Sequence, residues 1–163
     1  MATLVSTRLA KHYNHIVEDL DRSMLGYDLI KQINKLTEDE PGGEYFELLK
    51  QTFEALDDPA VAPAIIRFWF SAQLLRLSGH EPNLQTDAAG QKLKPGLAYN
   101  FDHEHMCLVP AEHGRLTADH IKFLRLSFAA HPAKVLAQVR GSAGLLDPLS
   151  YLVIDMFQAH LRV

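Results

Sequence analysis

The most apolar stretch of the sequence reads Ile65-Ile66-Arg67-Phe68-Trp69-Phe70-Ser71-Ala72-Gln73-Leu74-Leu75-Arg76-Leu77. Its apolar side chains are spread around a whole helical circumference, which is typical of a helix that is buried on most sides. We therefore predict a central helix over residues 61–77. Gly79 suits the left-handed position that follows a helix, and Pro82 comes where the helix cannot continue.

Apolar residues recur at spacings of three and four elsewhere, which indicates amphipathic helices that pack one face into the core. Before the central helix, these stretches cover residues 4–20, 23–36 and 45–56. In the second stretch, the predicted buried stripe consists of Met24, Tyr27, Ile30, Ile33 and Leu36.

Three more helices are predicted in the last third of the chain. One begins after Thr117, which is a candidate N-cap. A short one runs from Pro132, which suits a first turn, to Val139. The last follows a turn at residues 141–144 and has Pro148 in its first turn.

In residues 81–114 the helical period disappears, and proline and glycine punctuate the sequence. Residues 97–101 and 106–109 are predicted to form two short strands of an irregular hairpin. The predicted fold class is therefore mainly α. We expect a single helical domain over residues 1–163, with about six to seven helices and an irregular hairpin insertion near residues 85–114.

The charge of the chain is weakly acidic and unevenly distributed. The formal net charge is −4, which argues against this chain alone holding a nucleic-acid backbone through bulk electrostatics. Residues 1–60 carry six Lys and Arg against twelve Asp and Glu, or −6, whereas residues 61–163 carry ten against eight, or +2. We therefore expect an anionic partner to meet the second part of the chain.

Several function classes lack their sequence signatures. The chain has no Gly-x-Ser-x-Gly elbow, no Gly-x-x-x-x-Gly-Lys loop and no Gly-x-Gly-x-x-Gly run, so we expect no enzyme and no cofactor. Its one cysteine, Cys107, cannot form an internal disulfide. The start lacks a signal-peptide pattern, and no stretch approaches the ~20 apolar residues of a membrane span. We therefore expect a cytoplasmic protein without a membrane partner.

The predicted hairpin contains a cluster of metal-ligand residue types. His103, His105 and Cys107 alternate with a period of two, which in a strand would direct all three to one face, and His113 follows a possible turn. Such a set could close a tetrahedral zinc site. The alternative is a group of exposed loop histidines beside a buried cysteine. A small zinc protein or metalloenzyme is thus a second functional hypothesis.

Two arginines stand in the most apolar helix. The guanidinium groups of Arg67 and Arg76 have to reach water, pair with an acid or bind an anionic ligand. A pocket that combines them with Phe and Leu side chains would suit an acidic peptide with a hydrophobic end. The alternative is an internal salt bridge to an acid of the first three helices. Lys122 and Arg125 on a later helix could add to this basic surface.

Three motifs resemble one known family. They are the run Tyr45-Phe46-Glu47-Leu48-Leu49, the downstream pair Tyr99-x-Phe101, and the pattern Phe-x-x-x-Leu-Leu-x-x-x-Gly-aromatic-x-Pro-x-Leu, which here spans Phe70 to Leu84. His80 stands at the aromatic position of that pattern. On these residues the chain resembles the C-terminal helical domain of the RecO family of DNA repair proteins.

The resemblance implies a binding protein and not an enzyme. RecO-like proteins act as recombination mediators: they anneal complementary strands, bind the acidic C-terminal tail of the single-stranded DNA-binding protein, join RecR and help to load RecA. The helical part is associated with the tail contact. The resemblance therefore makes Arg67 and Arg76 candidates for that contact.

The chain departs from the family pattern in two places. RecO-like proteins begin with an OB-fold that binds single-stranded DNA, whereas this chain opens in what resembles the linker after it, so the main DNA contact is expected to lie outside this chain. Many relatives also carry a four-cysteine zinc site after the Pro-x-Leu motif. Here Leu84 is followed by Gln85-Thr86-Asp87-Ala88, so residues 81–114 are expected to form a loop or hairpin in place of that site.

Overall fold

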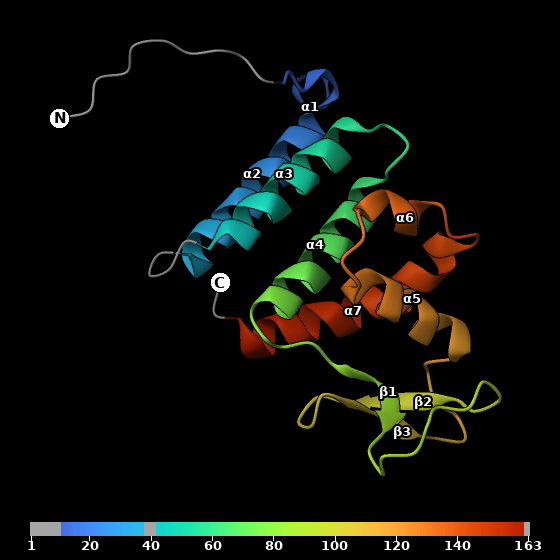
Figure 1. Ribbon diagram of the computed structural model, residues 1–163. Coiled ribbons are helices and arrows are strands. Elements are labelled where there is room, and N and C mark those ends of the chain that lie inside the picture. Colours follow the sequence, from blue (N-terminus) through green and yellow to red (C-terminus); the bar gives the residue numbers. More distant parts are fainter. Residues whose placement is uncertain (1–10, 38–41, 162–163) are drawn as a thin grey trace.

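The structure is a computed structural model that describes residues 11–37 and 42–161. These residues form seven helices and one three-stranded sheet, so the mainly α fold class is confirmed (Figure 1). The predicted central helix is confirmed as α4 (Pro63–Leu77), which packs against most of the other helices. It begins at Pro63 because the preceding Ala62 is extended and a proline fits the first helical turn.

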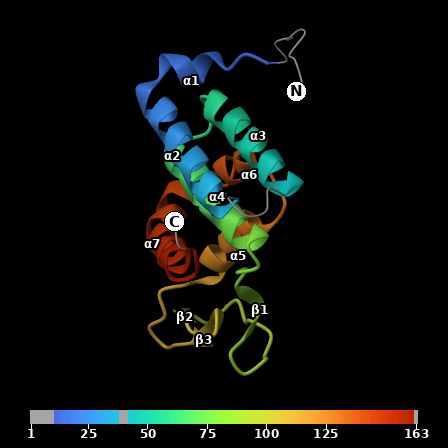
Figure 2. The same cartoon turned by 90° about the vertical axis from the view of Figure 1, so that its left-hand side faces the viewer.

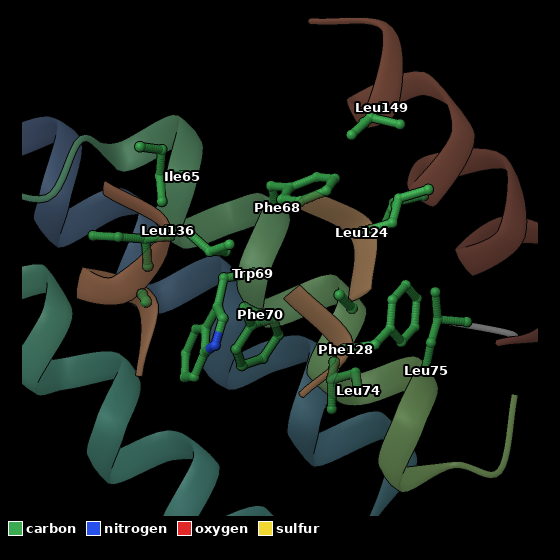
Figure 3. Close-up of a cluster of buried hydrophobic side chains, with 14 of the residues drawn as sticks. Ile65, Phe68, Trp69, Phe70, Leu74, Leu75, Leu124, Phe128, Leu136 and Leu149 are labelled. Carbon is green, nitrogen blue, oxygen red and sulfur yellow. The ribbon is translucent and has the colours of Figure 1, made fainter. Parts of the chain in front are cut away.

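The core surrounds α4 on nearly all sides. Figure 3 shows apolar side chains of α4 meeting those of the surrounding helices: Ile65, Phe68, Trp69, Phe70, Leu74 and Leu75 with Leu124, Phe128, Leu136 and Leu149, all of them buried. The polar atoms of two α4 side chains are paired within this core. Trp69 Nε1 donates to the carbonyl of His131 at 2.7 Å, and Gln73 Nε2 donates to the carbonyl of Ser127 at 2.6 Å.

Three helices precede α4 in the chain: α1 (Asn14–Glu18), α2 (Leu20–Leu36) and α3 (Gly43–Asp57). The second and third lie side by side and both contact α4 (Figure 2). The last two agree with the predicted stretches to within three residues at each end.

The prediction of one helix over residues 4–20 is wrong in its described part. The chain has no helix at residues 11–13 and is extended at Asp19, so that α1 is a separate short helix. The Asp19 carboxylate accepts a hydrogen bond from the backbone N–H of Arg22 and thereby caps α2. Residues 4–10 lie outside the described part of the chain.

The buried face of α2 also differs from the prediction. Leu25, Leu29 and Ile33 are buried, whereas Met24 and Tyr27 are 59% and 61% exposed. The reason is that α2 packs against both α3 and α4, besides α1. A Cβ at Gly26 would lie 3.3 Å from a methyl group of Leu56 in α3, so the missing side chain lets α3 pack closely on this face and turns Met24 toward solvent.

Three helices follow the sheet region: α5 (Ala118–Phe128), α6 (Ala133–Ala137) and α7 (Ser142–His160). Thr117 is the N-cap of α5, as predicted, and forms a reciprocal capping box with His120. Pro132, which was predicted in the first turn of α6, is its N-cap instead, and the helix ends at Ala137, two residues before the predicted end at Val139. Within the described residues no helix has the length and apolar character that crossing a bilayer requires.

The start of α7 was predicted wrongly. It begins at Ser142, after Gly141 in the left-handed conformation (φ 76°), so Pro148 lies inside the helix. Because Pro148 has no N–H, the carbonyl of Gly144 loses its helical partner. Both Gly144 and Pro148 are exposed, so water can bind this carbonyl while Leu149 continues to pack in the core.

The sheet contains β1 (Asn83–Asp87), β2 (Tyr99–Asp102) and β3 (Cys107–Pro110) in the order β1-β3-β2. The antiparallel β2–β3 pair confirms the predicted hairpin, and β1, which runs parallel to β3, was not predicted. The sheet lies at the opposite end of the molecule from α1 (Figures 1 and 2). Tyr99 and Leu116 exchange two backbone hydrogen bonds of 2.9 Å, and a side chain at Gly114 would collide with the Tyr99 backbone.

A buried arginine joins α2 to the connection between α3 and α4. Arg22 is 7% exposed, and its guanidinium donates to the carbonyls of Leu56 at 2.7 Å, Val61 at 3.1 Å and Asp58 at 3.2 Å. Buried carbonyls that lose their donors are costly to leave unpaired. Arg22 therefore fixes the path by which the chain enters α4.

We expect Arg22→Met to lower the free energy of unfolding by about 3 kcal/mol, because methionine keeps the apolar stem but removes the guanidinium that donates to the buried carbonyls of Leu56 and Val61. Urea denaturation followed by circular dichroism measures this change. Arg67→Met is the matched control, since Arg67 is half exposed and its ion pair with Asp28 is long, at 3.9 Å; its cost should stay below about 1 kcal/mol. Equal costs for the two variants would contradict the assigned role of Arg22.

Candidate functional site

The four residues of the zinc hypothesis are not brought together. His103 and His105 lie in the turn between β2 and β3, where the period of two that holds in a strand does not apply. Cys107 begins β3 and is buried, and His113 lies in a later turn. Within residues 11–37 and 42–161, no three His, Cys, Asp or Glu side chains are placed to share a metal ion.

These side chains have other contacts. His105 Nδ1 lies 2.8 Å from Oδ2 of Asp102, and this hydrogen bond raises the pKa of His105 and lowers the pKa of Asp102. The ring of His103 stands edge-on to Phe101, with 5.1 Å between centroids. Burial, followed by the nearby carboxylates of Asp102 and Asp87, raises the pKa of the Cys107 thiol.

The four candidate cations are also separated. Arg67 and Arg76 are nine positions apart, which at about 3.6 residues per turn places them on opposite faces of α4. Arg76 donates through Nε and one terminal nitrogen to Oε1 of Gln73, at 3.1 and 3.0 Å. It faces a hollow beside α3 that is also lined by Glu44 and Glu47, so its surroundings are acidic.

Arg125 and Lys122 lie on α5. Arg125 donates to the carbonyl of Leu84 through two nitrogens, at 2.9 and 2.6 Å, and so ties β1 to the helices. Lys122 is exposed, and its ammonium lies 3.1 Å from the carboxylate of Asp119. The same stretch of α5 borders a hollow that Arg140 also lines.

Arg67 lies in a groove of about 520 Å³ where α2, α4 and α7 meet. Much of its lining is apolar, with contributions from Met24, Phe68, Val153 and Ile154. Met24 and Ile154 are 59% and 43% exposed, so water covers large apolar side chains here. Exposed apolar surface of this kind is typical of a binding site.

The groove continues into a second hollow of about 480 Å³, which shares Arg67, Asp28 and Ile154 and adds Lys31 and Lys35. We call the two hollows together the α2–α7 groove. It is mostly apolar at the Met24 end, where Asp21 also lines it, and basic at the end where the two lysines lie, with Asp28 and Arg67 in both hollows.

Sequence reasoning missed Lys31 and Lys35. The spacing along the sequence could have indicated them. Met24, Asp28, Lys31 and Lys35 follow one another at intervals of four, three and four and so share one face of α2.

Comparison with known proteins assigns the family. The family model "Recombination protein O C terminal" matches residues 17–163. The chain belongs to the RecO family. The "DNA repair protein RecO" of Syntrophus aciditrophicus (strain SB) is 31% identical over 85 residues, which cover 52% of this chain and 32% of that protein. This chain thus aligns with about a third of that relative's length, and no solved structure matches it significantly.

The RecO family is one of DNA repair and recombination proteins, as the resemblance of the sequence implied. One feature of this RecO-family chain is a pair of histidine rings between the segment after α4 and the end of α7. The ring of His80 stacks on the ring of His160 in the last turn of α7, with 4.8 Å between centroids.

The His105–Asp102 contact gives a pH-dependent prediction. Because the pKa of His105 is raised in the folded protein, its contribution to folding stability is fully present below its ordinary pKa of 6.5. That contribution is lost as pH rises through the pKa of the folded state. Because the pKa of Asp102 is lowered in the folded protein, its contribution to folding stability is fully present above its ordinary pKa of 3.8. That contribution is lost as pH falls through the pKa of the folded state. Between the folded-state pKa values of the two groups, Asp102 is therefore a carboxylate and His105 is protonated.

We expect Asp102→Asn to move the NMR titration midpoint of His105 back toward 6.5, because the carboxylate that accepts its hydrogen bond, the main cause of the raised pKa, is removed. Asp119→Asn, which removes a carboxylate next to Lys122 and not next to His105, is the control and should leave the midpoint unchanged. An unchanged midpoint in Asp102→Asn would show that the hydrogen bond is not formed in solution.

Proposed function

We propose that this chain is the partner-binding helical part of a recombination mediator, and that the α2–α7 groove binds the acidic C-terminal tail of the single-stranded DNA-binding protein. Membership in the RecO family supports the repair role. The observation that carries the tail contact is the two-part lining of the groove, apolar around Met24 and Phe68 and basic at Lys31 and Lys35.

The groove has the two features that an acidic tail with an apolar last residue needs. The apolar side chain would be removed from water between Met24, Phe68 and Val153, and burial of one such side chain contributes about 1.5–3 kcal/mol. Carboxylates of the preceding residues would then lie toward Lys31 and Lys35. Charged hydrogen bonds of this kind fix the direction of the peptide as well as its affinity.

Arg67 links the two ends of the groove. Its ion pair with Asp28 is long, at 3.9 Å, and both side chains are 51% exposed. Exposed pairs of this kind contribute about 0–1 kcal/mol, so a carboxylate of the peptide can compete with Asp28 for the guanidinium. Arg76, Lys122 and Arg125 line other surfaces and have no part in this contact as we propose it.

The wider role follows the family. We propose that the chain acts in the cytoplasm without catalysis or a cofactor of its own, alongside RecR, and that it supports strand annealing and RecA loading. In this proposal, single-stranded DNA is held mainly by an OB-fold outside the chain.

The test uses a fluorescein-labelled peptide with several acidic residues before a final Pro-Phe carboxylate, followed by fluorescence anisotropy at low salt. We expect Arg67→Ala, and the double change Lys31→Ala with Lys35→Ala, each to weaken binding by about tenfold, which is 1.4 kcal/mol. Ile154→Glu should weaken it further, because it replaces an apolar side chain by a carboxylate where the two hollows join.

Lys122→Ala is the matched control, because it removes one exposed positive charge from α5, outside the groove. It should change binding by less than about twofold. A peptide whose final Phe is replaced by Ala should also bind weakly. Absence of binding at low salt, or equal losses for Arg67→Ala and Lys122→Ala, would overturn the proposal.

A further inference from the structure

A second concave surface lies between the sheet and α7, outside the α2–α7 groove. It is a cleft of about 460 Å³ lined by Phe101 and His103 of the hairpin, Arg115, and the α7 residues Pro148, Tyr151 and Asp155. We call it the β2–α7 cleft. Tyr151 is 72% exposed, which leaves a large aromatic ring of α7 in water.

The cleft has a rigid base. Its floor includes Leu116 and Leu152, which are 4% and 8% exposed. The segment that carries Arg115 is held against β2, because Tyr99 and Leu116 exchange backbone hydrogen bonds and the Arg115 N–H donates to Oδ1 of Asn100 at 3.2 Å. Phe101 thus stands on a paired strand and Tyr151 on a helix, whereas His103 stands on the turn that follows β2.

Flat rings and a guanidinium are the groups that bind unpaired bases. Phe101 and His103 already pack edge to face at 5.1 Å, and Tyr151 lines the same cleft from α7. Stacking on such side chains accepts any base, because every base has a flat face. Arg115 can stack or hold the neighbouring phosphate. Among the described residues it forms no ion pair within 4.0 Å.

We propose that the β2–α7 cleft binds a single strand of nucleic acid through its bases. This site is separate from the α2–α7 groove and shares no residue with it. Asp155 repels phosphate from its edge of the cleft and can accept a hydrogen bond from an amino group of a base. The strand therefore lies with a phosphate toward Arg115.

This mode of binding has its own signature. Few cations line the cleft, so few counterions are released when the strand binds. For single strands the slope of log K against log salt is about −0.7 per phosphate contact, and we expect a slope near −1. Binding that depended on bulk charge would give a much steeper slope, and the net charge of −4 makes such binding unfavourable.

The test uses the whole 163-residue chain and a labelled 15-nucleotide deoxythymidine strand, followed by fluorescence anisotropy. We expect Tyr151→Ala to weaken binding by about fivefold or more and Arg115→Ala to weaken it with a smaller salt slope. A strand of the same length with abasic sites keeps its phosphates and should bind much more weakly. A uridine strand with the same loss in Tyr151→Ala also supports the proposal, because the contact is to the base.

Tyr27→Ala is the matched control, since Tyr27 is an equally large ring, 61% exposed, on α2. Circular dichroism should show all three variants folded, because each changed side chain lies on the surface. Equal binding of the abasic strand, or equal losses for Tyr151→Ala and Tyr27→Ala, would overturn the proposal. Peptide binding is measured on the same samples, so the failure of either site is seen separately from the other.

Discussion

The burial of α4 on nearly all sides is the constraint on which the rest of the structure depends. A helix so placed has to pair each polar side chain inside the core or lead it out between its neighbours. Trp69 and Gln73 are paired with backbone carbonyls of the segment before α6, whereas Arg67 emerges between α2 and α7. The α2–α7 groove is therefore where the packing of α4 lets the guanidinium of Arg67 reach solvent. The groove is partly apolar because it opens from the core.

The parts of the fold that follow from local signals could be predicted. The central helix is marked by a continuous apolar run, and Thr117 by its side chain at the start of α5. The buried face of α2 could not be predicted, because it depends on how closely α3 approaches Gly26. β1 has no alternating apolar pattern and pairs in parallel with β3, so its partner is set by tertiary structure.

The candidate site could be predicted only in part, for a related reason. Arg67 is conspicuous in an apolar helix, but its spacing of nine from Arg76 places the two arginines on opposite faces, so they do not share one pocket. Lys31 and Lys35 lie in the acidic first 60 residues, and a charge summed over part of a chain does not show where single cations gather. Arg22 was missed because most of its partners are backbone carbonyls, which leave no mark in a side-chain pattern.

The single cysteine has a practical consequence. Cys107 is 7% exposed, and its thiol is held in the protonated form by burial, so it reacts slowly with thiol-directed reagents. A cysteine introduced at the rim of the α2–α7 groove or of the β2–α7 cleft would therefore be labelled in preference to the native one. Spectroscopic probes can thus be attached to either surface without altering the core, and distances between occupants of the two surfaces can be measured in one molecule.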